Sequence, residues 1–157
     1  MVRTELRPVS QSWLIDWLRR AFARPTPRAR VIAPAVVNPG SSLEVEWWIW
    51  HDAPEVTLVT VSLVGTEVAH RRISARTGIS VVTETRPFLT LELDRQAPED
   101  GSPVASGHVE AMVPSRTIPT LVGRLNEIRW AVMVEASFKT VTILRQEFPI
   151  AVVGASG

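Results

Sequence analysis

The chain has 157 residues, of which 45% are hydrophobic and 21% are charged, and its net charge is +1. The length suits one domain with a single core, and the composition is that of a globular protein rather than a disordered one. No apolar run approaches the roughly 20 residues that a membrane-spanning helix needs. The chain has no cysteine, which excludes disulfides and thiolate metal sites.

Charge is distributed unevenly along the chain. Residues 1–30 hold seven arginines against two acidic residues, a net charge of +5, so the remaining residues carry −4. This N-terminal segment is therefore expected to be distinct from the body of the protein. Its apolar stretch contains Asp16 and is followed at once by Arg19 and Arg20, which makes it too short and too charged for a signal peptide. We expect a cytoplasmic protein, with a peripheral position at the inner membrane surface as the variant of that expectation.

The segment from Ser12 to Phe22 predicts an amphipathic helix. At 100° per residue its apolar side chains fall on an arc of roughly 200°, with the charged side chains opposite. The apolar set comprises Trp13, Leu14, Ile15, Trp17, Leu18, Ala21 and Phe22. The basic surface, which suits the negative end of the helix dipole, comprises Arg19, Arg20 and Arg24. Pro25 and Pro27 end the helix, so residues 1–30 are predicted to be this helix and a basic, proline-containing linker.

From residue 31 onward, short strands and turns alternate at the spacing of a β-sandwich. We expect one such domain over residues 31–153, followed by a C-terminal tail, residues 154–157. Glycine or proline is expected to separate the strands, and Gly65 is one of these breaks. The expected strands are residues 31–37, 43–50, 56–64, 67–75, 79–84, 87–94, 107–113, 127–138 and 141–152.

The strand over residues 43–50 has the clearest alternation. Its period of two predicts one face that is buried in the core. That core face comprises Leu43, Val45, Trp47 and Ile49. Trp48 and Trp50 fall on the opposite face, beside Glu44 and Glu46, so a lone sandwich would leave these two tryptophans partly exposed.

A second aromatic residue is expected in the core at Trp130, which is flanked by apolar residues at period two. The loop before it, residues 114–124, is the longest connection of the chain. Ile118, Leu121 and Val122 are expected to anchor this loop through their apolar side chains.

Two motifs lie near the two ends of the expected sandwich. The first is a hairpin that opens at Pro39-Gly40 and closes with the hydrophobic-x-Gly-x-Glu turn Leu63-Val-Gly-Thr-Glu67. The second, over residues 107–152, is a strand that ends at Pro114, a loop that contains Pro119, and a long strand before the final one. Together they resemble the arrestin fold, taken broadly to include the retromer arrestin-like subunit and bacterial sporulation-control proteins.

This resemblance implies an all-β, immunoglobulin-like (arrestin-like) sandwich that serves as a binding or scaffolding module without catalytic activity. It covers about one lobe of an arrestin. The sequence contains neither a second lobe nor a tail with the charged partners that lock a two-lobed arrestin, so receptor and phosphate sensing are not implied.

The candidate residues for catalysis or metal binding are the three histidines, His51, His70 and His108. His51-Asp52 falls in a turn, where a solvated pair is the simpler interpretation, and a surface metal pair of His108 with Glu110 is conceivable. No two histidines share a local metal-ligand spacing, and neither a nucleophile elbow nor a phosphate loop is present. We therefore expect no catalytic residue, no metal, no cofactor and no small-molecule substrate, and we rank a metal-dependent enzyme last.

Nucleic-acid binding would depend on Arg71, Arg72 and Arg76 together with the N-terminal arginines. A short charged edge strand more often prevents aggregation than binds phosphate. The near-neutral total and the acidic body argue against an extended basic footprint. No nucleic-acid partner is expected.

The aromatic face of the predicted helix has three possible destinations. It can pack on Trp48 and Trp50 of its own sandwich, on another protein or a second copy, or on an anionic membrane surface. We expect a protein-interaction module, an adaptor or scaffold, and the alternative is a peripheral membrane protein anchored by the helix. The expected partner-binding residues are Trp13, Trp17, Leu18, Phe22, Trp48 and Trp50.

Overall fold

A computed structural model describes residues 27–50, 56–98, 104–139 and 143–154. Over these ranges the chain is all-β, and its ordered elements are strands only. The predicted N-terminal helix lies outside the described residues. The strands are β1 (Arg28–Ile32), β2 (Val36–Val37), β3 (Ser42–Trp50), β4 (Val56–Ala75), β5 (Gly78–Gln96), β6 (Val104–Met112), β7 (Leu121–Val122), β8 (Asn126–Phe138) and β9 (Ile143–Val152).

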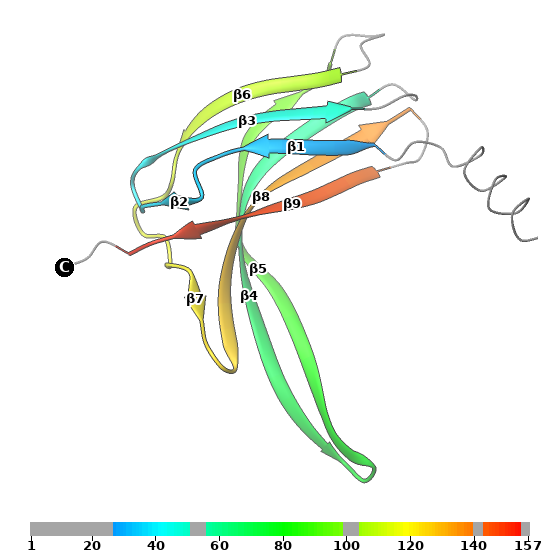
Figure 1. The fold of residues 1–157 in the computed structure, drawn as a ribbon, viewed down its shortest axis with the longest axis vertical. Coiled ribbons are helices and arrows are strands. Elements are labelled where there is room, and N and C mark those ends of the chain that lie inside the picture. Colours follow the sequence, from blue (N-terminus) through cyan, green and yellow to red (C-terminus); the bar gives the residue numbers. More distant parts are fainter. Residues whose placement is uncertain (1–26, 51–55, 99–103, 140–142, 155–157) are drawn as a thin grey trace, which may run out of the picture.

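These strands form two packed sheets, as a β-sandwich does (Figure 1). The smaller sheet has the order β1-β3-β6, and the larger has the order β2-β9-β8-β4-β5, with β7 paired to β8. Only the pairing of β2 with β9 is parallel. The expectation of an all-β sandwich is confirmed for the described residues.

The first expected strand, residues 31–37, is divided between the two sheets. β1 begins at Arg28, where it pairs with Trp50 of β3, and β2 pairs with β9 on the other side of the sandwich. Strand β1 starts earlier than expected because Ala29 is buried against the core. Pro34 lies between the two strands and has no N–H for a strand ladder, which suits the crossing between sheets.

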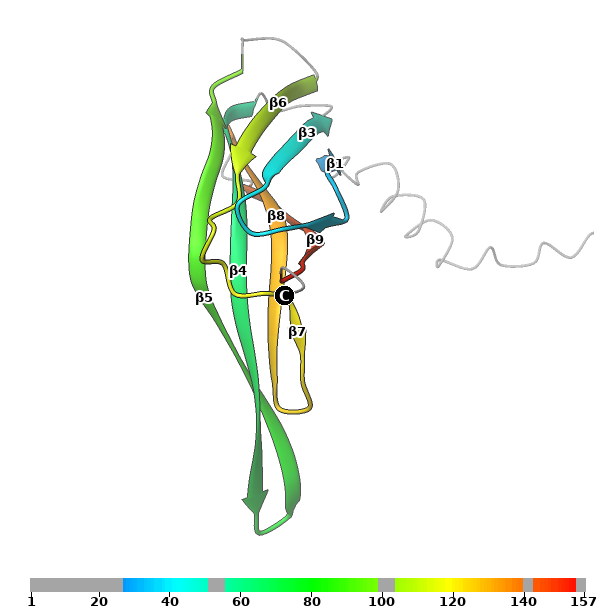
Figure 2. The same ribbon diagram turned by 90° about the vertical axis from the view of Figure 1, so that its left-hand side faces the viewer.

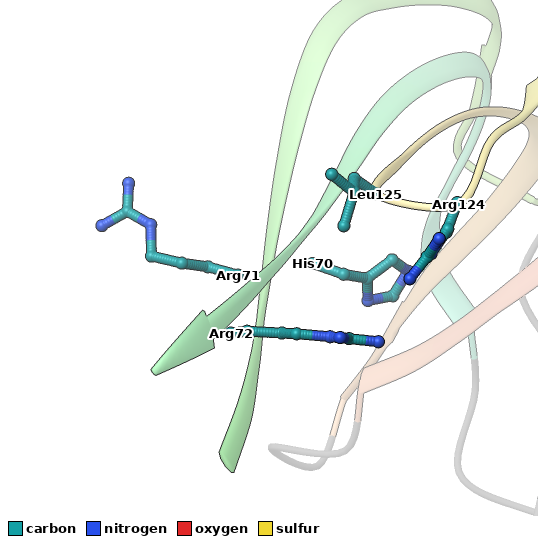
Figure 3. Close-up of a pocket in the computed structure, with 5 residues that line it drawn as sticks. All are labelled: His70, Arg71, Arg72, Arg124 and Leu125. Atoms are coloured by element: carbon teal, nitrogen blue, oxygen red, sulfur yellow. The ribbon is translucent and has the colours of Figure 1, made fainter. Parts of the chain in front are cut away.

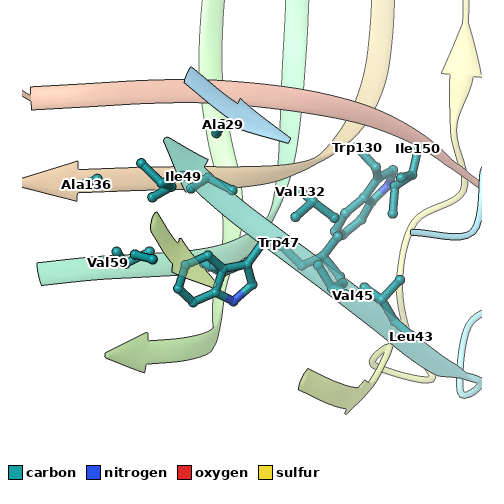
Figure 4. Close-up of a cluster of buried hydrophobic side chains, with 14 of the residues drawn as sticks. Ala29, Leu43, Val45, Trp47, Ile49, Val59, Trp130, Val132, Ala136 and Ile150 are labelled. Atoms are coloured by element: carbon teal, nitrogen blue, oxygen red, sulfur yellow. The ribbon is translucent and has the colours of Figure 1, made fainter. Parts of the chain in front are cut away.

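The core lies between the two sheets and follows the predicted alternation (Figure 4). The four inward side chains of β3 are 0–1% exposed, as the period of two predicts. Trp130 of β8 is also buried, which confirms its expected place in the core. The inward set of β3 and its main partners on the facing sheet are Leu43, Val45, Trp47, Ile49, Val59, Val61, Leu63, Trp130, Val132 and Val134.

Two glycines sit beneath the two core tryptophans. A Cβ at Gly65 would lie 2.6 Å from Phe88 and 2.8 Å from Trp130, and a Cβ at Gly107 would lie 2.6 Å from the Trp47 ring. Gly65 is therefore not a break between strands, because β4 continues through it. The absence of a side chain at Gly65 leaves room for the rings of Phe88 and Trp130. The expected division into strands 56–64 and 67–75, and into 79–84 and 87–94, is wrong, since each pair is one continuous strand.

The long hairpin of β4 and β5 extends beyond the sandwich. Strand β8 pairs with β4 only as far as Ala69, whereas β5 pairs with β4 as far as Ala75. Residues 70–84, here called the arm, therefore form a two-stranded ribbon that projects from the body (Figures 1 and 2). The turn at its tip ends at Gly78, whose φ of 139° favours glycine.

The loop before β8 is held by polar contacts rather than by the expected apolar anchors. Ile118, Leu121 and Val122 are all exposed, Val122 by 83%. Instead, the indole Nε1 of Trp130 donates to the carbonyl oxygen of Ile118 at 2.9 Å. Thr120 and Val152 exchange two further hydrogen bonds, each 2.8 Å long. The prediction that apolar side chains anchor this loop was wrong. The loop is held by hydrogen bonds to its backbone, and the hydropathy of its residues does not predict such bonds.

Candidate interaction surfaces

The first candidate surface is the outer face of the smaller sheet, at the end where β1 begins. Alternation along β3 places Trp48 and Trp50 there, opposite the buried Trp47, as predicted. Trp50 is 43% exposed. The guanidinium carbon of Arg30 lies 6.0 Å from the ring centroid of Trp48, at the limit for a cation–π contact. Arg28 pairs with Trp50 across the strands, so two cations flank the two tryptophans.

The other residues expected to bind a partner lie outside the described residues. These are the aromatic and aliphatic anchors Trp13, Trp17, Leu18 and Phe22, together with the basic residues Arg19, Arg20 and Arg24. Their expected contact with Trp48 and Trp50 stays a prediction.

The opposite end of the same outer face is acidic. Glu44, Glu46 and Glu110 lie there, and Glu44 is directly opposite Glu110 on the neighbouring strand. We call these three residues the acidic patch. Their polar contacts are neutral or weakly basic: Glu44 Oε1 is 2.8 Å from His108 Nε2, and Ser42 Oγ donates to Glu110 Oε1 at 2.6 Å. Among the described residues, no arginine or lysine forms an ion pair with any of the three.

Two exposed apolar side chains border the acidic patch. Ile32 of β1 pairs with Glu46, and Met112 of β6 pairs with Ser42, so both lie on the outer face. Both side chains are about half exposed or more, 49% and 61%. The surface therefore combines negative charge with apolar area, in contrast to the cationic and aromatic end.

The third surface lies at the base of the arm, where a pocket of about 500 Å³ opens (Figure 3). Its lining residues are His70, Arg71, Arg72, Arg124 and Leu125. The backbone N–H of His70 donates to the carbonyl oxygen of Leu125 at 2.7 Å, which joins the β7–β8 loop to the arm. Figure 3 shows Arg72 on the same side of the ribbon as His70 and Arg124, with Arg71 on the other side.

The histidine at this base is held on both sides. His70 Nδ1 lies 3.2 Å from Thr83 Oγ1, and Nε2 lies 3.4 Å from Glu127 Oε1. Arg129 Nε donates to the other carboxylate oxygen of Glu127 at 2.7 Å. That hydrogen bond is the main cause of a lowered pKa of Glu127, partly opposed by desolvation and aided by His70. The Glu127 carboxylate thus contacts both His70 and Arg129. The three arginines of the pocket form no ion pair with any described residue; they are Arg71, Arg72 and Arg124.

The described residues of these three surfaces offer charged and apolar contact area. His108 and Glu110 share the outer face, but the imidazole bonds to Glu44. His51 and Asp52 lie outside the described ranges. Among the described residues, no group of three or more histidine, cysteine or acidic side chains could hold a metal ion. No helix found in the described ranges could span a membrane.

The sequence predicts a short charged edge over residues 70–72, with Arg76 as a further arginine nearby. This prediction missed Arg124, which the β7–β8 loop brings to the pocket from far along the chain. It also missed the acidic patch as a unit, because Glu110 reaches Glu44 only through the pairing of β3 with β6. The pairing of strands is set by the whole sheet and leaves no local signal at either residue.

The two-sheet architecture resembles that of a solved bacterial protein. Spo0M, a sporulation control protein from Bacillus subtilis, matches with a TM-score of 0.51 and 11% sequence identity, covering 80% of this chain and 49% of that chain. The present chain thus spans about half the length of Spo0M. Sequence identity this low shows a shared fold alone.

Two enzymes are less similar in structure. The DNA glycosylase AlkC from Pseudomonas fluorescens, bound to DNA that contains an abasic site analog, gives a TM-score of 0.39 at 14% identity, covering 92% of this chain and 37% of that chain. AvmM, which catalyses macrocyclization in alchivemycin A biosynthesis, gives 0.40 at 12% identity, with 83% and 91% covered. Scores at this level carry no argument about the present chain. No protein-family model and no curated protein matches the sequence.

Proposed function

We propose that this chain is a non-catalytic protein-interaction module, an adaptor or scaffold built on an arrestin-like sandwich. The observation that carries the proposal is the exposure of Trp50 beside Trp48, with Arg28 and Arg30 at their side. Tryptophan and arginine are the residue types most enriched among interface residues that dominate binding energy. A large aromatic surface left in water is costly, so its presence supports a partner that covers it.

The N-terminal segment belongs to the same proposed surface. Six Cα steps separate Phe22 from Arg28, which limits their distance to about 22 Å. Arg28 pairs with Trp50, so the length of the linker allows Phe22 to reach the exposed tryptophans. Trp13, Trp17 and Phe22 would then add hydrophobic anchors to a partner that first covers Trp48 and Trp50.

A photo-cross-linking amino acid at position 50 tests this function in the cells that naturally produce the protein. We expect discrete protein adducts at position 50, and a weaker yield when Trp48→Gln is added. The same probe at Val122, which is more exposed but lies on the other sheet, is the matched control. Equal adducts at both positions, or none at position 50, would refute the proposal.

A second candidate function is attachment to an anionic membrane. The same observation favours it in part, because tryptophans flanked by Arg28 and Arg30 suit the interface of a negatively charged bilayer. Co-sedimentation with vesicles of phosphatidylglycerol and phosphatidylcholine, but not of phosphatidylcholine alone, would support this candidate. Equal recovery with both vesicle types would count against it.

A further inference from the structure

We propose that the arm of one copy of this chain binds the acidic patch of a second copy, so that the protein self-associates head to tail. The inference deepens the proposed function and rests on it, since it names another copy of the chain as a partner of the interaction module. It uses the acidic end of the outer face and leaves the tryptophan end free.

The arm exposes apolar side chains on both of its faces. Ile73, Ile79, Val81 and Val82 are between 39% and 73% exposed. Val82 pairs with Arg71 and Val81 pairs with Arg72, so each face of the ribbon carries an arginine beside a valine. The sheet cannot cover these residues, because β8 ends its pairing with β4 at Ala69. A ribbon that is apolar on both faces gains from a partner that surrounds it.

The arm also carries net positive charge. Residues 70–84 contain Arg71, Arg72 and Arg76 against a single acidic residue, Glu84. Arg124 adds a fourth cation at the base of the arm. In the described structure these arginines have no carboxylate partner of their own, so their full charge is available to a complementary surface.

The acidic patch has the complementary character. Glu44 lies directly opposite Glu110, and like charges in this position destabilise a sheet. The contacts with His108 and Ser42 offset that repulsion only in part. Arginines from a second molecule would relieve the rest. Ile32 and Met112 at the border of the patch offer apolar area for the exposed side chains of the arm.

The contact has to be made between copies. The arm projects away from the body, whereas the acidic patch lies on the outer face of the smaller sheet (Figures 1 and 2). The arm therefore cannot fold back onto the patch of its own chain. Because the two surfaces differ, each contact joins the arm of one copy to the patch of another. The contacts close in a dimer where two copies exchange arms about a twofold axis, and they build a ring or an open filament where they do not.

Edge-to-edge pairing of two β5 strands explains these features less well. Pro87 has no N–H to donate, and the charges of Glu84 and Arg86 stand in the middle of that edge. Proline and charge are the devices that keep edge strands apart. Such pairing would also leave Glu44 and Glu110 without a role.

Two charge-reversed variants of the full chain test the inference. R71E/R72E changes the arm, and E44K/E110K changes the patch, while R116E is the control for reversal of an exposed charge elsewhere. We expect analytical ultracentrifugation to show concentration-dependent association of the wild type and of R116E that weakens as salt rises. Each double variant should raise the dissociation constant at least tenfold.

Mixing the two double variants is the decisive step. The unaltered arm of E44K/E110K should bind the unaltered patch of R71E/R72E, and the two reversed surfaces should also match, so association should return on mixing. R71Q/R72Q removes the charge without reversing it and should weaken association in the same direction. Circular dichroism confirms that each variant is folded before its mass is measured.

Three results would overturn the inference. They are a wild type that stays monomeric at every concentration, a patch variant that associates like the wild type, and a mixture that fails to associate. Loss of binding to anionic vesicles in R71E/R72E, with unchanged association in solution, would assign the arm to a lipid surface instead. A monomeric wild type with adducts at position 50 would overturn this inference alone. Association without such adducts would overturn the tryptophan surface of the proposed function and leave the contact between arm and patch standing.

Discussion

Replacing Gly107 by alanine tests how closely β6 approaches the core tryptophan. The new methyl group would lie 2.6–2.7 Å from three atoms of the Trp47 indole, Cζ2, Cε2 and Nε1. Trp47 is 1% exposed, and its Nε1 donates to Asp94 at 3.1 Å. The ring therefore cannot move away without a loss of packing or of this hydrogen bond.

The magnitude follows from three contributions to the free energy of unfolding. Overpacking a well-filled core costs about 1–3 kcal/mol. Loss of a hydrogen bond to a charged group would add about 1.5–3 kcal/mol if the indole shifts. Alanine restricts the unfolded chain and returns about 0.4–1 kcal/mol. We expect Gly107→Ala to destabilise the protein by about 2–3 kcal/mol. Strain in the core and a partial shift of the indole each contribute to this cost, and the restricted unfolded chain offsets part of it.

Urea unfolding followed by far-UV circular dichroism measures this quantity. Ser106→Ala, at the exposed neighbouring position of β6, should change stability by no more than about 0.5 kcal/mol. In a Trp47→Phe background the smaller ring makes room, so Gly107→Ala should then cost almost nothing, a coupling of about 2 kcal/mol. An equal cost of Gly107→Ala in both backgrounds would refute the close approach of Gly107 to Trp47.

Three further predictions concern separate parts of the sandwich. Trp130→Phe removes the hydrogen bond to Ile118, so amide exchange in the loop before β8 should accelerate in hydrogen-exchange experiments. Arg129→Gln should raise the pKa of Glu127, as measured by carboxyl NMR titration. A lowered pKa stabilises the fold above the pKa of the unfolded chain, so the stability gap between wild type and Arg129→Gln should be present at neutral pH. That gap should close as pH falls through the lowered pKa of folded Glu127. Leu63→Ala should cost about 2–5 kcal/mol in urea unfolding because the side chain is fully buried, and a cost below 1 kcal/mol would contradict that packing.

The sequence predicted the parts of the fold that depend on local alternation. The inward face of β3 and the burial of Trp130 follow from period-two patterns and are confirmed. Gly65 misled the prediction of strand ends, because glycine marks a turn in most sequences but here lies under two aromatic rings. The requirement for glycine at position 65 follows only from the contact between the rings of Phe88 and Trp130, which lie on the strands at either side of β4.

The candidate surfaces were predictable to different degrees. The outward positions of Trp48 and Trp50 follow from the same alternation as the core. The arm was not predictable, because it arises from a difference in length between β4 and its neighbour β8. That difference depends on where the pairing between β4 and β8 ends. These strands are far apart in the chain, and the residues of neither strand show where their pairing ends.

The parallel pairing of β2 with β9 determines when this protein can fold during its synthesis. Val36 pairs with Ala151, so the larger sheet is completed only after almost the whole sandwich sequence has left the ribosome. At about 5–20 residues per second, roughly 6–23 s separate the synthesis of these two segments. The β4–β5 hairpin can form within microseconds of its emergence and carries Val59, Val61 and Leu63 of the facing sheet, but Trp130, Val132 and Val134 arrive only with β8. The nascent chain therefore leaves part of the apolar face of β3 uncovered for seconds, and we expect it to depend on chaperones that shield such segments at the ribosome exit.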